Sequence, residues 1–105
     1  MARLIWTEPA LSDLNDIAEY IALENLSAAK RLVQQVFSTV ERLEKEPDSG
    51  RIPAEMKNGR YREVVVGPCR IFYRHTSGQV FVLYIMRSER QMRKFLIEDR
   101  DAHSR

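Results

Sequence analysis

The chain has 105 residues, of which 44% are hydrophobic and 30% charged, with a formal net charge of +2 and one cysteine. We expect one domain over residues 1–105, because the length suits one domain and the apolar fraction is too high for a disordered protein. The lone Cys69 excludes an intrachain disulfide scaffold, and the longest apolar run, Val80 to Met86, is far shorter than the roughly 18 residues of a membrane span. Residues 7–9 interrupt the apolar start before a signal sequence can form, so we expect a cytoplasmic protein without membrane association.

The small net charge conceals an uneven distribution along the chain. Residues 1–50 carry five basic and nine acidic side chains, whereas residues 51–105 carry twelve basic and six acidic ones. Ten of those twelve basic residues are arginines, the residue type preferred for recognising phosphates and carboxylates. This polarity predicts an anionic partner, either a nucleic acid or an acidic protein.

The first half of the chain predicts a short strand followed by a helical hairpin. Residues 3–6 fit a strand, and Thr7 and Pro9 then mark a helix start, as a cap and a first-turn residue. Asn25 is the expected stop of this helix and Ser27 the expected cap of the next. Apolar residues at spacings of three and four give each helix one buried face: Ala10, Leu14, Ile17, Ala18 and Ile21 in the first, and Leu32, Val33, Val36, Phe37, Val40 and Leu43 in the second. Residues 47–50 end the second helix.

The second half predicts three strands. Segments 61–66, 69–75 and 79–86 are rich in β-branched and aromatic residues, and turn residues separate them. The middle segment alternates between a core face and an arginine face, and the last segment is apolar on both faces, as expected of a central strand. Met92, Phe95 and Leu96 indicate a final short helix, and residues 101–105 are expected to fray.

The predicted fold is therefore α+β. It has an N-terminal strand, an antiparallel two-helix hairpin packed on one face of a three- to four-stranded, mainly antiparallel sheet, and a short C-terminal helix.

The arginines of the second half are the candidate binding residues. They are Arg62, Arg70, Arg74, Arg87 and Arg90. Arg62, Arg70 and Arg74 are even-numbered on two successive strands, so one sheet face could collect them. Clustered guanidinium groups bind phosphates or stabilise the charge that develops when a phosphodiester is cleaved. The alternative is that solvent-facing strand positions simply need polar side chains.

Residues that could move protons are less well marked. Tyr61, His75 and Glu89 are the candidates, and Tyr61 and Glu89 are expected to be exposed, but no spacing pairs them. Tyr73 and Tyr84 fall in apolar alternation and are expected in the core. No Cys or His spacing fits zinc and no phosphate-binding loop is present, so we expect neither a metal site nor a cofactor.

The order of these segments resembles the RelE/ParE toxin superfamily over almost the whole chain. The resemblance is carried by the run 61–74 (YREVVVGPCRIFYR), the strand 80–86 followed by Arg87-Ser88-Glu89-Arg90, and the opening WTEPA at residues 6–10. It implies the toxin of a type II toxin–antitoxin module, associated with plasmid stabilisation and neutralised by a cognate antitoxin. The run 61–74 looks closer to the ParE branch, whose members inhibit DNA gyrase without acting as enzymes.

The RelE branch is the alternative that the resemblance implies. Its members are endoribonucleases that cleave mRNA on the ribosome. In that case Arg70 and Arg90 would steady the phosphate, and Tyr61, His75 or Glu89 would move protons. Many ParE-like members have a histidine where this chain has Arg87, and this departure leaves the choice of branch open. In either branch the five candidate arginines would contact the target or the antitoxin.

Overall fold

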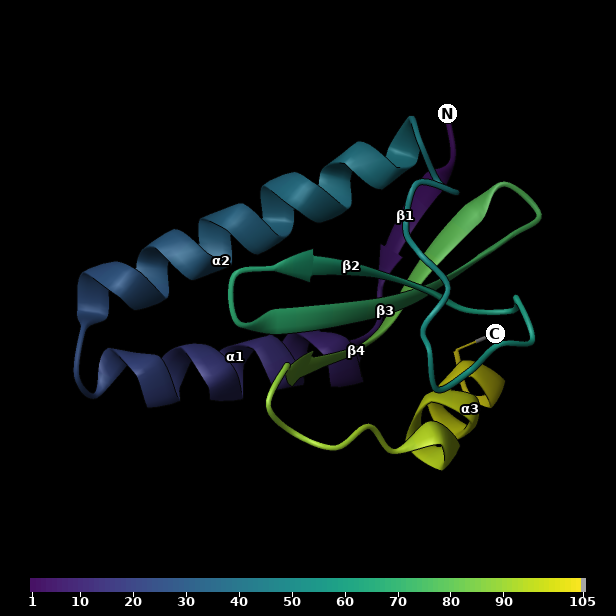
Figure 1. Ribbon diagram of the computed structural model, residues 1–105. Helices are drawn as coiled ribbons and strands as arrows, with labels where there is room; N and C mark the ends of the chain where they lie inside the picture. Colours follow the sequence, from purple (N-terminus) through teal and green to yellow (C-terminus); the bar gives the residue numbers. More distant parts are fainter. Residues whose placement is uncertain (105) are drawn as a thin grey trace.

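The computed structural model describes residues 1–104, and Arg105 lies outside the described residues. The elements in chain order are β1 (Arg3–Trp6), α1 (Glu8–Ala22), α2 (Leu26–Glu41), the 3-10 turn η1 (Arg42–Glu44), β2 (Arg62–Val66), β3 (Cys69–Thr76), β4 (Gln79–Arg87) and α3 (Lys94–Ala102) (Figure 1). The sheet has the strand order β1-β4-β3-β2, in which β1 runs parallel to β4 and the other two pairs are antiparallel. The predicted α+β architecture is confirmed.

Helices α1 and α2 form the predicted hairpin and cover one face of the sheet. The hydroxyl of Thr7 accepts a hydrogen bond from the Ala10 amide and donates one to the Val82 carbonyl at 2.7 Å, so the cap of α1 is tied to β4. Apolar side chains of both helices then pack with one face of the sheet into a core that includes Leu14 and Val36. The connected end of the hairpin projects beyond the sheet (Figure 1).

The link between the two helices differs from the prediction. Helix α1 already ends at Ala22, and Asn25 is the cap of α2, because its side chain accepts a hydrogen bond from the Ala28 amide at 3.0 Å. Ser27, the expected cap, lies inside α2. Both residue types suit the capping position, and the sequence alone did not separate the two.

Strand β4 is the central strand, and side chains on both of its faces are buried. Val80, Val82 and Ile85 pack toward the helical hairpin, whereas Phe81, Leu83 and Met86 join a second core beneath α3. The two cores explain why this segment is apolar at nearly every position.

A bulge interrupts the pairing of β3 and β4. Phe72 pairs with Tyr84 and Tyr73 pairs with Val82, so Leu83 has no partner of its own on β3. As a result Leu83 and Tyr84 both belong to the α3 side of the sheet. The bulge thus directs the Tyr84 ring toward the space between α1 and α3.

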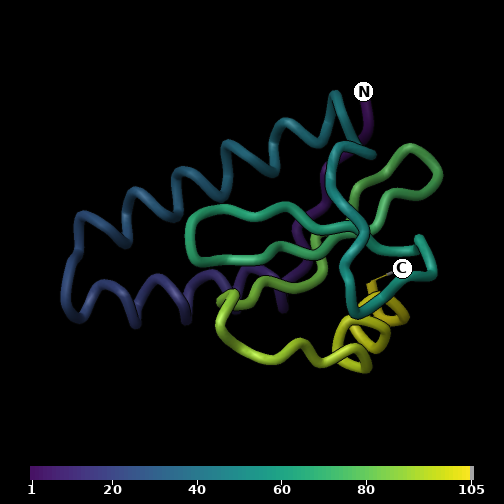
Figure 2. Tube along the Cα trace, viewed as in Figure 1, coloured from purple at the N-terminus to yellow at the C-terminus, as the bar shows by residue number. Residues whose placement is uncertain are grey.

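The connection from η1 to β2, residues 45–61, is fastened to the sheet at its start. The Tyr73 hydroxyl donates to the Pro47 carbonyl at 2.7 Å and accepts from the Gly50 amide at 2.9 Å. A Cβ at Gly50 would lie 2.6 Å from that hydroxyl oxygen, so only glycine fits at this position. Figure 2 shows the connection continuing past the sheet toward α3, where the buried side chains of Met56 and Tyr61 enter the second core.

Candidate functional site

The predicted gathering of Arg62, Arg70 and Arg74 on one sheet face is wrong for Arg62. In the register of β2 and β3, Arg62 pairs with Tyr73, a residue of the hairpin-side core, whereas Arg70 and Arg74 lie on the other face. Cross-strand partners share a face, so the register decides which residues of two strands lie together, and residue parity alone does not. Arg62 binds the backbone of the 45–61 connection, because its Nη1 donates to the Gly50 carbonyl at 2.8 Å.

Arg70 binds two carboxylates within the molecule. Its guanidinium donates to Glu63 at 2.6 and 3.1 Å and to both oxygens of Glu55 at 2.8 Å, while Arg51 also donates to Glu63. The hydrogen bonds from Arg70 lower the pKa of Glu55 to about 2, and those carboxylates raise the pKa of Arg70. Arg70 therefore holds the 45–61 connection against the sheet.

Arg74 belongs to a second internal cluster around a buried carboxylate. Asp101 of α3 is 1% exposed and accepts hydrogen bonds from Arg74 at 2.7 Å, from the Tyr61 hydroxyl at 2.9 Å and from Arg60 at 3.2 Å. The expectation that residue 101 frays is wrong, because these bonds fix it in place. Tyr61, expected to be exposed, is buried, and burial raises the pKa of its hydroxyl.

The candidate proton-transfer residues are dispersed over the molecule. Tyr61 contacts Asp101, whereas Nδ1 of His75 lies 3.0 Å from Asp48. His75 pairs with Val80 at one end of the β3–β4 ladder, and Arg87, whose guanidinium pairs with Glu89, lies at the other. On β3, His75 lies six positions from Cys69, the partner of Arg87, which is about 20 Å at the usual rise per residue. Tyr61 enters the core on the α3 side of the sheet, whereas His75 pairs with Val80 of the hairpin-side core, so these two lie on opposite faces, and Glu89 lies in neither place.

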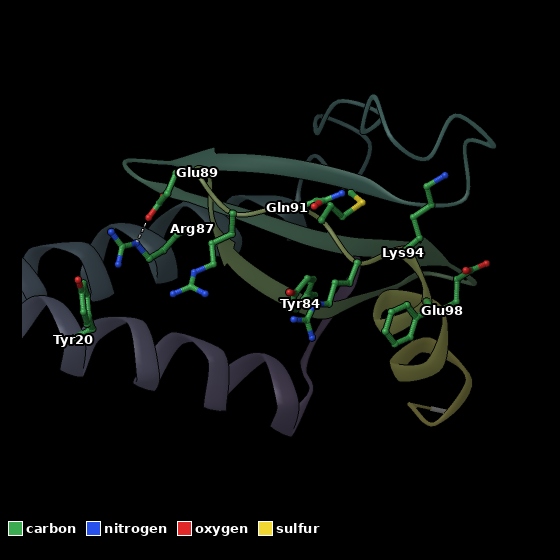
Figure 3. Close-up of a pocket in the computed structure, with 11 residues that line it drawn as sticks. Tyr20, Tyr84, Arg87, Glu89, Gln91, Lys94 and Glu98 are labelled. Atoms are coloured by element: carbon green, nitrogen blue, oxygen red, sulfur yellow. Dashed lines mark ion pairs between the residues drawn. The ribbon is translucent and has the colours of Figure 1, made fainter.

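An open, arginine-rich groove lies between α1 and α3, at the end of β4. We call it the basic groove, and it has a volume of about 1040 Å³. Figure 3 shows Tyr20 of α1 on one side, Tyr84 and Arg87 of β4 at the base, and Lys94 of α3 on the other side. Its basic and aromatic lining residues are Tyr20, Tyr84, Arg87, Arg90, Arg93, Lys94 and Phe95.

Two of the five predicted arginines lie in the basic groove. The Arg87 guanidinium lies 4.8 Å from the centre of the Tyr20 ring and pairs with Glu89 at 2.6 Å. Arg90 is exposed, and within residues 1–104 no acidic partner lies within salt-bridge distance of it. The structure thus brings together Arg87 and Arg90 and separates them from Arg62, Arg70 and Arg74.

Several residues of the basic groove are not among those predicted from the sequence. Arg93 and Lys94 follow Arg90 by three and four residues, and the charge pattern of residues 87–94 was the available signal for them. Tyr20 had no such signal, because it comes from α1, more than sixty residues earlier in the chain. Tyr84 was expected in the core and is half-buried at the base of the groove.

An ion pair holds together the two helices that border the basic groove. Strand β1 pairs with β4 only as far as Val82, so the edge of β4 beyond that point has no strand beside it. There the Asp13 carboxylate of α1 accepts a hydrogen bond from the Ile85 amide at 3.0 Å, and the Arg100 guanidinium of α3 donates one to the Leu83 carbonyl at 3.0 Å. Asp13 and Arg100 also form a bidentate ion pair with each other.

A second, apolar groove lies between α1 and α2 of the helical hairpin. It is lined by Ala18, Glu19, Ala22, Leu26, Ala29, Lys30, Val33 and Gln34. Leu23 and Leu26, at the connected end of the hairpin, are 83% and 59% exposed. An exposed apolar surface of this kind is typical of a protein interface.

Sequence and structure comparisons agree on the family of this chain. The sequence profile described as the ParE toxin of the type II toxin–antitoxin system parDE matches residues 4–92. The toxin homologue Y4kP of Sinorhizobium fredii is 35% identical over 89 residues, which cover 85% of this chain and 91% of the relative. Toxin RelE2 of Caulobacter vibrioides is 33% identical over 91 residues, which cover 86% of this chain and 99% of the relative.

A solved structure has the same fold. A chain from the chromosomal ParDE toxin–antitoxin system of P. aeruginosa superposes with a TM-score of 0.69 at 26% identity, covering 85% of this chain and 98% of that one. The protein therefore belongs to the ParE toxin family, within the RelE/ParE superfamily, and is the toxin of a type II toxin–antitoxin system. None of the helices α1, α2 and α3 is long and apolar enough to cross a membrane.

Proposed function

We propose that this toxin inhibits DNA gyrase by binding, without making or breaking a covalent bond itself. The observation that carries this proposal is the dispersal of Tyr61, His75 and Glu89. General acid–base cleavage of RNA needs a base and an acid within hydrogen-bond reach of one phosphodiester. A binding mechanism has no such requirement, and the open basic groove supplies an accessible surface for it.

Ribosome-dependent cleavage of mRNA is the second candidate function. It is kept because one relative is named RelE2. mRNA cleavage of the RelE type would use Arg70, Arg90, Tyr61, His75 and Glu89. Arg70, however, forms ion pairs with Glu55 and Glu63, and Tyr61 is buried against Asp101. Only Glu89 and Arg90 line the basic groove, and Glu89 is paired with Arg87. The arrangement therefore favours the gyrase proposal.

The protein partner of the proposal is a cognate antitoxin, acting with the toxin in the cytoplasm. The apolar groove of the hairpin fits one side of an amphipathic helix, because small residues line it and apolar side chains flank it. We therefore assign the antitoxin to this groove and the target to Arg87 and Arg90. Arg62, Arg70 and Arg74 keep their internal partners in this proposal.

Purified gyrase tests the target directly. Toxin, gyrase, ATP and supercoiled plasmid are incubated together, and linear DNA is measured after protein denaturation. In parallel, mRNA integrity is followed on translating ribosomes. We expect gyrase-dependent DNA breaks and intact mRNA, whereas cut mRNA with unaffected gyrase would move the protein to the second candidate function.

The antitoxin assignment is tested by placing a charge in the apolar groove. Ala22→Glu puts a carboxylate among its apolar side chains, and we expect antitoxin affinity to fall at least tenfold in calorimetry. Ser27→Glu makes the same change of charge on an exposed position outside the lining and should leave affinity within twofold. Equal affinity of the Ala22→Glu variant and the wild type would contradict the assignment.

A further inference from the structure

The basic groove contains positive charges that the molecule does not neutralise. Arg90, Arg93 and Lys94 are exposed and fall within five residues of chain, and residues 1–104 supply none of them with an ion-pair partner. Arg87 and Arg100, by contrast, are paired with Glu89 and Asp13. Three unpaired cations in one groove favour an anionic ligand with several charges.

The acidic residues of the groove do not offset this cluster. Of the groove's two acidic lining residues, Glu89 is already paired with Arg87, and Glu98 lies on α3. The lining thus has four basic side chains against two acidic ones, which leaves the basic groove with an excess of positive charge.

Aromatic rings flank the same charges. Tyr20 on α1 is 59% exposed, although the Arg87 guanidinium lies over its ring, and Phe95 on α3 is 66% exposed, so each helix presents an aromatic side chain to solvent. Exposed aromatic rings beside a positively charged groove are the usual arrangement for binding single-stranded nucleic acid, because bases stack on the rings while cations contact the phosphates. The base faces of a duplex are already stacked and are not available to such rings.

The edge of β4 argues against an extended acidic peptide as the ligand. An extended peptide commonly binds by adding a strand to an exposed sheet edge. The Ile85 amide is already bound by Asp13 and the Leu83 carbonyl by Arg100, so a new strand would first have to break this ion pair.

We infer that the basic groove binds the phosphate backbone of a single DNA strand, with Arg90, Arg93 and Lys94 on the phosphates and Tyr20 and Phe95 against the bases. The choice of DNA rests on the proposed function, since gyrase presents broken DNA to an inhibitor bound beside it. A DNA strand held in the basic groove could not be rejoined by gyrase. Binding alone would then stabilise the complex of gyrase with cleaved DNA.

Direct binding to an oligonucleotide tests this inference in the absence of gyrase. The probe is a fluorescein-labelled single-stranded DNA of mixed sequence and about 15 nucleotides, titrated with the full-length toxin while anisotropy is measured. Three phosphate contacts predict that log K falls with log salt with a slope of about −2. Arg90→Gln with Arg93→Gln should weaken binding at least tenfold and reduce the slope to about −0.7. Phe95→Ala, which keeps every charge, should weaken binding about fivefold or more.

A matched control removes the same charge elsewhere. Arg31→Gln with Lys45→Gln lowers the net charge equally at exposed positions outside the basic groove and should leave affinity within twofold. The inference fails if the wild type does not bind the probe, or if the control weakens binding as much as the groove variant. It also fails if a duplex of equal length binds as tightly. Displacement of the probe by polyglutamate at equal charge would assign the groove to an acidic protein.

The two proposals fail separately. Gyrase-dependent DNA breaks without oligonucleotide binding would overturn this inference and leave the proposed function intact. Oligonucleotide binding without gyrase-dependent breaks would support the inference and overturn the proposed function.

Discussion

Buried carboxylates determine what several of the arginines do. Glu63 and Asp101 are almost fully buried, and Arg70 and Arg74 neutralise them at 2.6 and 2.7 Å. Without Arg70 or Arg74, each carboxylate keeps only its more exposed arginine, Arg51 or Arg60, so the free energy of unfolding should fall by less than the roughly 3–5 kcal/mol that an unpaired buried charge costs. We therefore expect substitution of Arg70 or Arg74 to destabilise the fold, and a loss of toxicity in such a variant would not by itself show a role in target binding.

The Glu55 carboxylate gives a pH prediction for the Arg70 cluster. Its pKa in the folded protein is about 2, below the ordinary 4.5, so its pairing contributes stability above pH 4.5 and loses that contribution as the pH falls toward 2. Side-chain carboxyl chemical shifts should therefore give Glu55 a midpoint near 2. In an Arg70→Gln variant the midpoint should return toward 4.5, and a wild-type midpoint near 4.5 would contradict the described contact.

Tyr61 is expected to act in stability rather than in chemistry. Tyr61→Phe removes the hydroxyl that donates to Asp101, while Arg74 and Arg60 still neutralise the carboxylate. We expect the free energy of unfolding in urea to fall by about 1–2 kcal/mol. Toxicity at a temperature where the variant is folded should be unchanged, and a folded but inactive variant would instead indicate a catalytic tyrosine.

At the scale of helices and strands, the sequence predicted elements well and contacts between them poorly. The stripes of α1 and α2 and the wholly apolar β4 correctly predicted a hairpin on a sheet with a central strand, because burial sets those periodicities locally. The register of β2 against β3 and the bulge at Leu83 depend on pairing between strands, so the side occupied by Arg62 could not be predicted. The partners of Asp101 lie 27 to 41 residues away, so its burial left no local signal.

The ion pair between Asp13 and Arg100 is expected to fix the position of α3 relative to α1. Asp13→Ala removes the acceptor of the Ile85 amide and the partner of Arg100. We expect the Ile85 amide to exchange with deuterium at least tenfold faster, since a bond of this kind is worth about 1–3 kcal/mol. Asp16→Ala, an exposed change on the same helix, should leave that rate unchanged. Equal exchange rates in both variants would show that Asp13 does not protect this edge.

At the scale of the whole molecule, the two proposed partners use different surfaces. The antitoxin is assigned to the apolar groove of the hairpin and the target to the basic groove between α1 and α3, with Tyr20 of α1 on the border of the latter. The excess of basic residues in the second half is partly neutralised by ion pairs with buried carboxylates. Of the twelve basic residues in the second half, Arg51, Arg60, Arg70 and Arg74 are paired with Glu63 or Asp101, and Arg90, Arg93 and Lys94 carry the exposed charge of the basic groove.

In the proposed mechanism the toxin acts without moving a proton, and a triple variant that lacks all three candidate proton-transfer groups tests this. Tyr61→Phe, His75→Ala and Glu89→Gln are combined, folding is verified by circular dichroism, and gyrase-dependent linear DNA is measured against the wild type. We expect the folded triple variant to produce as many breaks as the wild type, within about twofold. A folded triple variant that no longer produces DNA breaks, while the Arg31→Gln and Lys45→Gln control still does, would show that the toxin needs a proton-transfer residue.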